Sequence, residues 1–589
     1  MKSHHAALAA LAALAPTLAV FVACACAFLV NVPAHEGPDE PGHHDYAFQY
    51  ERTGERPWVP GTTDGVRATH WHESSMAHHP VLYYAVLAGL GRVMDGGLAA
   101  PTPQFEEGRA PYALRHGHDE VAPRSDEVRA FFVLRGFSVV CGALSLVLLW
   151  ATVRRLAPNS AHAATLATGL LACLPQWQYA HAVLDNGALG TLLCFAALFV
   201  LARVWTFADE RRAVAVSWFD ALALGLAIGA ALATKLTALF LFAPAAAAAV
   251  RVVWRSERRA VALVRCGAAL ALALAALAPF VLENEARYGE PLARGVHAEA
   301  YEVSSIAHLA QQVGMELGEA RRVYLTQIFP QELGHSLVGV FGSNAVSVPD
   351  HSLWGWGAAA LLGVVGLVLG RGTPWRAVAL AAPVLALGLA QVVAYNLDFK
   401  QAQGRYLFPA VGALALVVGA GLAALAARSK RGAPVFVFAL LAAAAVDALH
   451  TAFVVVPRAY SASPAADPLL AAFCGSIGVA PHSADASIDV HEPADGARLV
   501  DSPTFVFDVP AERVVTLHLW LEHGPFMGGT FETLRADVNS GRWSLPPDLW
   551  ASLPVGSRVF WQVRVVPDRM RGEAALDVPR SAPRSLVRE

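Results

Sequence analysis

The sequence of 589 residues has little charge, few cysteines and no excess of basic residues. Charged residues make up 15% of the chain, whereas soluble domains usually contain about 25%. Because 44 basic residues are balanced by 47 acidic ones, no strongly basic surface is available to bind nucleic acid. Seven cysteines, most of them inside apolar runs, predict no disulfide framework. Apolar residues make up 55%, which excludes a disordered chain and favours a membrane protein.

Long apolar runs are abundant instead. The run from Trp218 to Val253 is too long for one crossing and contains Lys235, so we divide it near Thr234 and Lys235. The run from Pro80 to Met94 is too short to cross and fits a re-entrant or juxtamembrane helix. The first run is longer than the apolar part of a signal peptide, which favours an uncleaved helix. With about 20 residues per crossing, the sequence predicts an all-α polytopic membrane protein of about eleven transmembrane helices. Two of these helices come from the divided run Trp218–Val253. The others lie near residues 6–32, 130–151, 161–179, 187–205, 260–282, 352–370, 376–397, 405–427 and 434–456.

The positions of Lys and Arg predict the orientation, because short cytoplasmic loops carry most of these residues. Basic groups such as Arg154–Arg155 and Arg428–Arg431 fall on one face when the predicted helices alternate. We therefore expect a multi-pass protein of the bacterial inner membrane with its N-terminus in the cytoplasm. The loops 33–129 and 283–351 and the region after Val456 are then extracytoplasmic.

The composition changes at the end of the apolar region. Residues 1–456 form the predicted transmembrane domain, and 457–486 read as a linker rich in Pro, Ser, Ala and Asp. Short, partly alternating apolar runs then predict a small β-sandwich of immunoglobulin or fibronectin type over 487–589. The runs are Ser487–Val490, Thr504–Val509, Val514–Leu521, Arg535–Val538 and Val559–Val566.

The first extracytoplasmic loop opens with two adjacent carboxylates, Asp39 and Glu40. If Pro41 starts a helix, Asp39 lies at its N-terminal end, where the dipole keeps a carboxylate ionised and able to accept a proton. A plain solvated loop is the alternative. His43 and His44 follow, so these two carboxylates and two imidazoles are candidate ligands for a divalent metal such as zinc or manganese. The spacing matches no closed metal motif, and no cofactor is certain.

Three further charged residues lie at predicted membrane boundaries. Asp185 follows the third crossing and either caps a helix or has a functional role. Lys235 lies between two apolar helices, so it either snorkels to the interface or faces a polar cavity. Arg405 has a fork that suits phosphate oxygens, with an interface anchor as the alternative, and Gly404 before it would let a ligand come close.

Five segments recur in one order on this face: Asp39-Glu40-x-x-His43, His79-Pro80-x-Leu82-Tyr83-Tyr84, Asp185-Asn186, Thr234-Lys235-Leu236-Thr237 and Gln403-Gly404-Arg405-Tyr406. Together they resemble the landmarks of the GT-C superfamily, polytopic membrane glycosyltransferases that take a sugar from a polyprenyl-phosphate carrier. More narrowly, they look like a bacterial branch with a Pro-Asp-Glu-x-x-His loop and a Gln-Gly-Arg-Tyr motif. The resemblance covers about residues 1–456. One departure is Val81, where related sequences often have a second proline.

The resemblance implies a role for each matching residue. Asp39, with Glu40 as its neighbour, would be the base that acts on the acceptor, and Asp185 would help to orient the acceptor or a metal. The residues implied to bind the lipid phosphate or the sugar are His43, His79, Tyr83, Lys235, Gln403, Arg405 and Tyr406. The implied partners are a polyprenyl-phosphate-linked sugar, membrane lipid, and a glycan, lipid or protein acceptor.

Transfer from a lipid phosphate needs an activated acceptor hydroxyl and cations that neutralise the departing phosphate. A carboxylate and two cations suffice, so the sequence predicts an inverting sugar transfer at the extracytoplasmic face. A transporter or flippase of a lipid-linked saccharide or another solute is the main alternative, but no inverted repeat or midplane run of acids is present. A third alternative is an envelope scaffold that the membrane helices merely anchor, but anchoring needs far fewer crossings.

Overall fold

The structure is a computed structural model of the chain. It describes residues 2–32, 37–59, 74–94, 97–98, 126–160, 162–207, 216–301, 304–312, 315–341, 346–457, 490–508, 515–521, 532–538, 541–545, 547–552, 555–556, 558–565 and 584–589. The predicted linker 457–486 lies outside these residues except for its first position.

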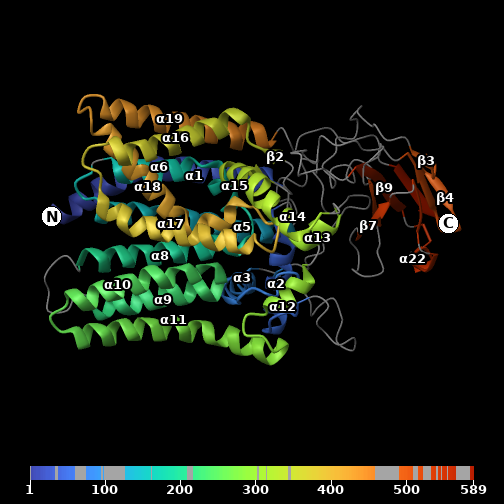
Figure 1. The fold of residues 1–589 in the computed structure, drawn as a ribbon, viewed down its shortest axis with the longest axis horizontal. Helices are drawn as coiled ribbons and strands as arrows, with labels where there is room; N and C mark the ends of the chain where they lie inside the picture. Colours follow the sequence, from blue (N-terminus) through green and yellow to red (C-terminus); the bar gives the residue numbers. More distant parts are fainter. Residues whose placement is uncertain are drawn as a thin grey trace.

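The membrane region is a bundle of long helices that run side by side (Figure 1). Within the described ranges, nine helices are long and apolar enough to cross a membrane, and two shorter apolar helices, α6 and α9, occupy further predicted positions. The predicted all-α polytopic membrane fold is therefore confirmed. Its main helices are α1 (Lys2–Asn31), α5 (Asp126–Leu156), α6 (Ala163–Cys173), α8 (Asn186–Phe207), α9 (Trp218–Thr234), α10 (Phe242–Arg255), α11 (Arg259–Tyr288), α16 (Asp350–Leu369), α17 (Trp375–Tyr395), α18 (Phe408–Ala426) and α19 (Ala433–His450).

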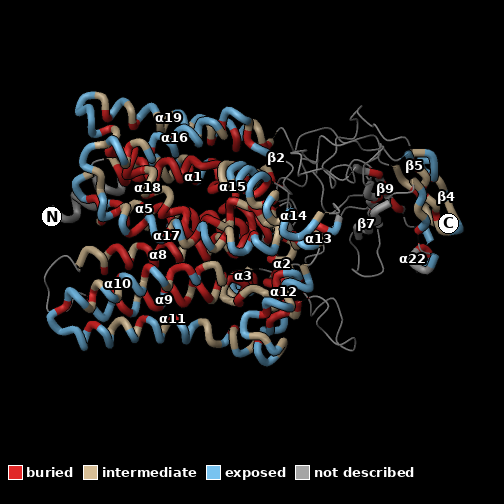
Figure 2. Tube along the Cα trace, viewed as in Figure 1, coloured by how far each residue is buried: buried red, intermediate tan, exposed pale blue. Residues whose placement is uncertain are grey.

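Glycines allow the central helices to pack backbone to backbone. A side chain at Gly366 of α16 would collide with the main chain of Gly421 in α18, and one at Gly363 would crowd Val418. Small residues let membrane helices approach in this way. In the most apolar stretch of α18, 72% of the residues are buried, against 17% in α11, so α18 is central and α11 peripheral (Figure 2).

The long run around Lys235 is interrupted where the sequence predicts. α9 ends at Thr234, Lys235 has an extended backbone, and the 3₁₀ turn η1 (Leu236–Leu241) leads into α10. The break places a charged side chain at the end of one helix instead of in the middle of a longer one.

Short helices gather at the end of the bundle away from the N-terminus (Figure 1). The run Pro80–Met94 contains α3, whose 11 residues are too few to cross a membrane, as expected. The other short elements are α2 (Glu40–Thr53), α7 (Pro175–Ala180), α12 (Arg294–Ala300), α13 (Ile306–Gln312), α14 (Leu317–Val323), η3 (Tyr324–Ile328), α15 (Phe329–Val338), β1 (Val340–Phe341), β2 (Val346–Ser347), η4 (Gly404–Leu407) and η5 (Thr451–Val455), with α3 spanning Leu82–Arg92. These segments supply most of the candidate site.

The C-terminal region is a small β domain. One sheet has the strand order β4-β10-β9-β6-β7 and the other β3-β5-β8, and residues of both sheets share one hydrophobic cluster around Phe505 and Trp561. The immunoglobulin or fibronectin type stays a prediction. The strands β4, β8 and β10 have no counterpart in the sequence prediction. The elements are β3 (Val490–Glu492), β4 (Ala497–Leu499), β5 (Thr504–Phe507), β6 (Val515–Leu521), β7 (Glu532–Val538), β8 (Arg542–Ser544), α22 (Pro547–Ser552), β9 (Arg558–Val565) and β10 (Arg584–Arg588).

Candidate active site

Asp39 lies at the N-terminus of α2, as the sequence predicts. The helix begins at Glu40 with Pro41 in its first turn, and Asp39 has the left-handed backbone angle φ of 60°. Its carboxylate makes no capping hydrogen bond to the helix. Because the side chain is not used to cap α2, it is free to contact another part of the molecule.

That contact is Arg405, which joins two carboxylates. Its guanidinium forms an ion pair with Asp39 and another with Asp185, whose Oδ2 is 2.9 Å from Nη1. Its Nε donates to Gln403 Oε1 over 2.6 Å, so Gln403 helps to fix the orientation of the guanidinium. Arg405 is only 7% exposed. A buried arginine with two acidic partners is the centre of the candidate site.

Asp185 is enclosed on all sides by donors and positive charge. Lys235 Nζ lies 3.5 Å from its Oδ1, and the Gly187 amide donates to the same oxygen over 2.6 Å. Burial raises the pKa of the Asp185 carboxyl, but the charges of Lys235 and Arg405 outweigh burial and hold the pKa well below its ordinary value. Asp185 is therefore a fixed anion.

Lys235 does not snorkel. Its side chain is 9% exposed, paired with Asp185, and its Nζ lies 5.6 Å from the ring centre of Tyr406. The same ring lies 5.2 Å from the Arg405 guanidinium carbon. Tyr406 thus lies beside both cations, within the range of cation–π attraction.

His43 connects the first loop to this cluster. Its Nδ1 is hydrogen-bonded to Tyr84 Oη over 2.9 Å, and its Nε2 lies 3.9 Å from Asp185 Oδ1. Burial lowers the pKa of His43 to about 4 against the opposing charges of Asp185 and Asp39. Tyr83 is fully buried, with its ring edge-on to His43 at 6.1 Å. At neutral pH His43 is an uncharged link.

Glu40 points to a different partner, Arg135 of α5, which sequence reasoning missed. Arg135 Nε and Nη2 each lie 2.7 Å from one Glu40 oxygen, and both side chains are completely buried. Arg135 also donates to the carbonyl of Val32 at 2.6 Å, while Glu40 accepts from the amide of Leu184 at 2.8 Å. This pair ties the end of α1 to the start of α2 and to the residue before Asp185. The charge within the apolar run 130–151 was the signal that could have revealed it.

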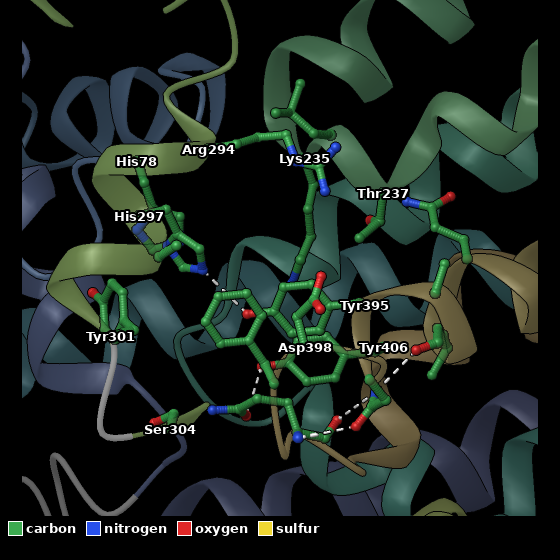
Figure 3. A pocket seen from close by; sticks show the side chains of 18 of the residues that line it. His78, Lys235, Thr237, Arg294, His297, Tyr301, Ser304, Tyr395, Asp398 and Tyr406 are labelled. Carbon is green, nitrogen blue, oxygen red and sulfur yellow. Dashed lines mark hydrogen bonds between the residues drawn. The ribbon is translucent and has the colours of Figure 1, made fainter. Parts of the chain in front are cut away.

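The cluster opens on a cavity of about 920 Å³ at this end of the bundle. Six of the predicted residues line it: Asp39, His43, His79, Lys235, Arg405 and Tyr406. The other five, Glu40, His44, Tyr83, Asp185 and Gln403, are not among its lining residues. Of the two carboxylates paired with Arg405, Asp39 is the accessible one, with 43% of its side chain exposed against 4% for Asp185. Figure 3 shows Lys235, Tyr395, Asp398 and Tyr406 around the same space.

The expectation for Gly404 was wrong. A side chain at this position would collide with the main chain of Ser336 and Leu337 in α15, and the Gly404 amide donates to Ser336 Oγ over 2.8 Å. The glycine therefore allows α15 to pack against the Gln-Gly-Arg-Tyr segment and is not an approach route for a ligand.

Part of the chain matches a family of membrane glycosyltransferases. The family model for dolichyl-phosphate-mannose-protein mannosyltransferase matches residues 128–282, well under half of the chain. The matched segment contains Arg135, Asp185 and Lys235. This match agrees with the resemblance seen in the sequence motifs. No curated protein matches significantly.

Several solved structures resemble the chain at low identity. ArnT from Cupriavidus metallidurans bound to undecaprenyl phosphate has 14% identity and a TM-score of 0.43, covering 79% of this chain and 75% of that chain. AglB from Archaeoglobus fulgidus, in complex with an inhibitory peptide and a dolichol-phosphate, has 12% identity and a TM-score of 0.39, covering 76% and 56%. The S. cerevisiae protein O-mannosyltransferase complex bound to the sugar donor has 18% identity and a TM-score of 0.30, covering 47% and 34%.

The candidate metal ligands do not fit a metal. Among the described residues, no three His, Cys, Asp or Glu side chains form a group that could hold one. Asp39 is paired with Arg405 and Glu40 with Arg135, so their negative charge is already balanced. His44 is buried with its ring 5.2 Å from that of Phe131.

Proposed function

We propose that this chain is an integral membrane glycosyltransferase that moves a sugar from a polyprenyl phosphate to an acceptor hydroxyl. The observation that carries the proposal is the Arg405 cluster: one accessible carboxylate and two cations in the wall of a cavity between membrane helices. The partial match to a mannosyltransferase family supports the same reaction. The acceptor is a glycan, a lipid or a protein.

Asp39 is the general base in this proposal. Desolvation in the cavity wall raises the pKa of its carboxyl, but the charge of Arg405 and the hydrogen bond from it outweigh this, and the pKa lies below its ordinary value of 3.8. Asp39 is therefore ionised at neutral pH. Asp185, which is buried and held by three partners, is a positioning residue that fixes Lys235 and Arg405.

The transfer proceeds by a single displacement with inversion. The acceptor oxygen attacks the anomeric carbon, its proton passes to Asp39, and the bond between that carbon and the phosphate oxygen breaks. Lys235 and Arg405 neutralise the departing polyprenyl phosphate. A double displacement needs a second carboxylate as nucleophile. Asp185 is too enclosed for that role, and the other carboxylate of the cavity, Asp398, is paired with Arg321.

The reaction takes place at the extracytoplasmic face of a bacterial inner membrane. Basic residues such as Arg154 and Arg428 lie at the loops we assign to the cytoplasm, and the candidate site lies at the opposite end of the helices that carry them. The N-terminus is then cytoplasmic, and the β domain is extracytoplasmic.

The alternative of a transporter is not favoured. Transporter sites lie near the midplane on broken helices, whereas Asp39, Asp185 and Arg405 come from segments at the end of the bundle. Transfer of labelled sugar from a polyprenyl phosphate in proteoliposomes, compared with movement of the lipid between leaflets, tests the choice. Movement of the lipid between leaflets without transfer of the sugar would refute the proposal that the protein is a glycosyltransferase.

Removing Lys235 tests the phosphate site. We expect Lys235→Met to weaken binding of undecaprenyl phosphate roughly tenfold or more, because a charge-assisted contact is worth about 1.5–3 kcal/mol. Titration of the purified protein with the lipid measures the effect. Lys430→Met, in a loop after α18, is the matched control and should bind like the unchanged protein. Equal affinity in the Lys235 variant would place the phosphate elsewhere.

The pH profile tests the charge states of the cluster. His43, with its pKa lowered to about 4, is neutral between pH 5 and 8, and Asp39, with a lowered pKa, is ionised over the same interval. We therefore expect kcat/KM to show no ionisation of either group between pH 5 and 8, and activity to fall only in more acidic solution. An acid limb with its midpoint near the ordinary imidazole value of 6.5, absent in His43→Gln, would contradict this assignment.

A further inference from the structure

One side of the cavity is formed by aromatic and imidazole rings that the proposed reaction does not use. We call His78, His297, Tyr301, Tyr395 and Phe399 the ring wall, and all five line the cavity. The ring centres of His78 and His297 are 4.5 Å apart, those of His297 and Tyr301 4.7 Å, and those of Tyr395 and Phe399 5.1 Å. The rings come from three separate parts of the chain, so the fold brings them together. Figure 3 shows His78, His297 and Tyr301 on one side of the cavity, with Thr237 and Tyr406 on the other.

The ring wall also contains polar atoms, on His297 and Tyr395. His297 Nε2 is hydrogen-bonded to Tyr395 Oη over 3.2 Å, whereas His297 Nδ1 is buried and has no partner in the described part of the chain. The hydrogen bond to Tyr395 orients the His297 ring within the wall. Tyr395 is 37% exposed and lines the cavity. The wall therefore offers ring faces and hydrogen-bonding groups together.

The wall carries no charge at neutral pH. Burial lowers the pKa of His78 to about 3, helped by the neighbouring His297, and burial lowers the pKa of His297 to about 4. Uncharged rings do not attract a phosphate. Flat apolar faces with polar groups at their edges suit a sugar ring, which has C–H faces and hydroxyls at its rim.

The wall continues into the cation cluster. The ring centre of Tyr395 lies 6.2 Å from that of Tyr406, and Tyr406 lies beside Lys235 and Arg405. A sugar joined to a phosphate at those cations would meet the ring wall next. The acceptor is not joined to that phosphate, so the phosphate does not fix it at this distance.

We propose that the ring wall binds the sugar of the lipid-linked donor, with the sugar ring stacked on His297 and Tyr395. This inference rests on the proposed function, because it takes the lipid phosphate to lie at Lys235 and Arg405. It assigns the specificity for the sugar to residues outside the five sequence motifs. His78 directly precedes the second motif, and the other four lie farther from it.

The test compares two kinds of lipid on the same variants. The probes are bare undecaprenyl phosphate and undecaprenyl phosphate carrying mannose, glucose or arabinose. We expect the unchanged protein to bind at least one sugar-bearing lipid more tightly than the bare lipid. His297→Leu and Phe399→Leu should each weaken binding of that lipid roughly 3- to 10-fold, the range of a lost ring contact. Both variants should bind the bare lipid as tightly as the unchanged protein does. Retained binding of the bare lipid also reports that the variant is folded.

Tyr395→Phe is the matched control, since it keeps the ring and removes only the hydroxyl. It should retain most of the affinity that Tyr395→Leu loses. Equal weakening of both kinds of lipid, or a wild-type protein that prefers none of the sugars, would overturn the ring wall while leaving the phosphate site intact. Raised acceptor KM with unchanged donor affinity would also overturn it. A wild-type protein that binds neither kind of lipid would instead refute the proposed function.

Discussion

Replacing Asp39 by Asn is expected to lower kcat for sugar transfer by about 10²–10⁴-fold, the usual contribution of a general base. Asn keeps the shape of the side chain and tolerates the left-handed backbone angle at this position. The variant loses the proton acceptor and one of the two charges paired with Arg405, but Asp185 still holds that arginine, so the variant should fold and still bind undecaprenyl phosphate. Single-turnover transfer of labelled sugar measures the effect without a contribution from product release.

The control for this variant is Asp508→Asn, which changes an exposed carboxylate in the β domain paired with His491. Its transfer rate should equal that of the unchanged protein. Full activity in the Asp39 variant would remove Asp39 as the base. Loss of activity together with loss of lipid binding would indicate a structural role instead.

Replacing Arg135 by Met is expected to destabilise the protein by about 3–5 kcal/mol, because Glu40 would remain buried without its counter-charge. The loss should appear as a lower midpoint of thermal unfolding in detergent. It should also reduce transfer, since the pair holds the loop that carries Asp39 and the segment before Asp185.

Two further variants make this result specific. Arg135→Met combined with Glu40→Met should recover part of the lost stability, because no unpaired charge is then buried. Arg322→Met removes an exposed partner of Glu319 and should change the stability by only about 0–1 kcal/mol. If the Arg135 and Arg322 variants unfold at the same temperature, the buried pair does not have the assigned role.

The sequence predicted the elements of the site better than their contacts. Apolar run lengths located the crossing helices, and the charge inside the run Trp218–Val253 located the break at Lys235. Pro41 indicated the start of α2. These features are local, so they can be read from neighbouring residues.

The contacts depend on distant parts of the chain. Nothing near Arg405 in sequence indicates that it joins Asp39 and Asp185, which are hundreds of residues away. The same holds for Glu40 with Arg135 and for the ring wall, whose aromatic and imidazole residues come from three separate segments. Gly404 was misread because the backbone of α15, not a ligand, fills the space beside it.

The most direct test of the account is a structure of the full-length protein with undecaprenyl phosphate. We expect its phosphate between Lys235 and Arg405, with Asp39 facing the same cavity and the prenyl chain running between the membrane helices. A phosphate bound away from these residues, or in the second cavity between α16 and α18, would contradict the central claim that this cluster is a glycosyl-transfer site.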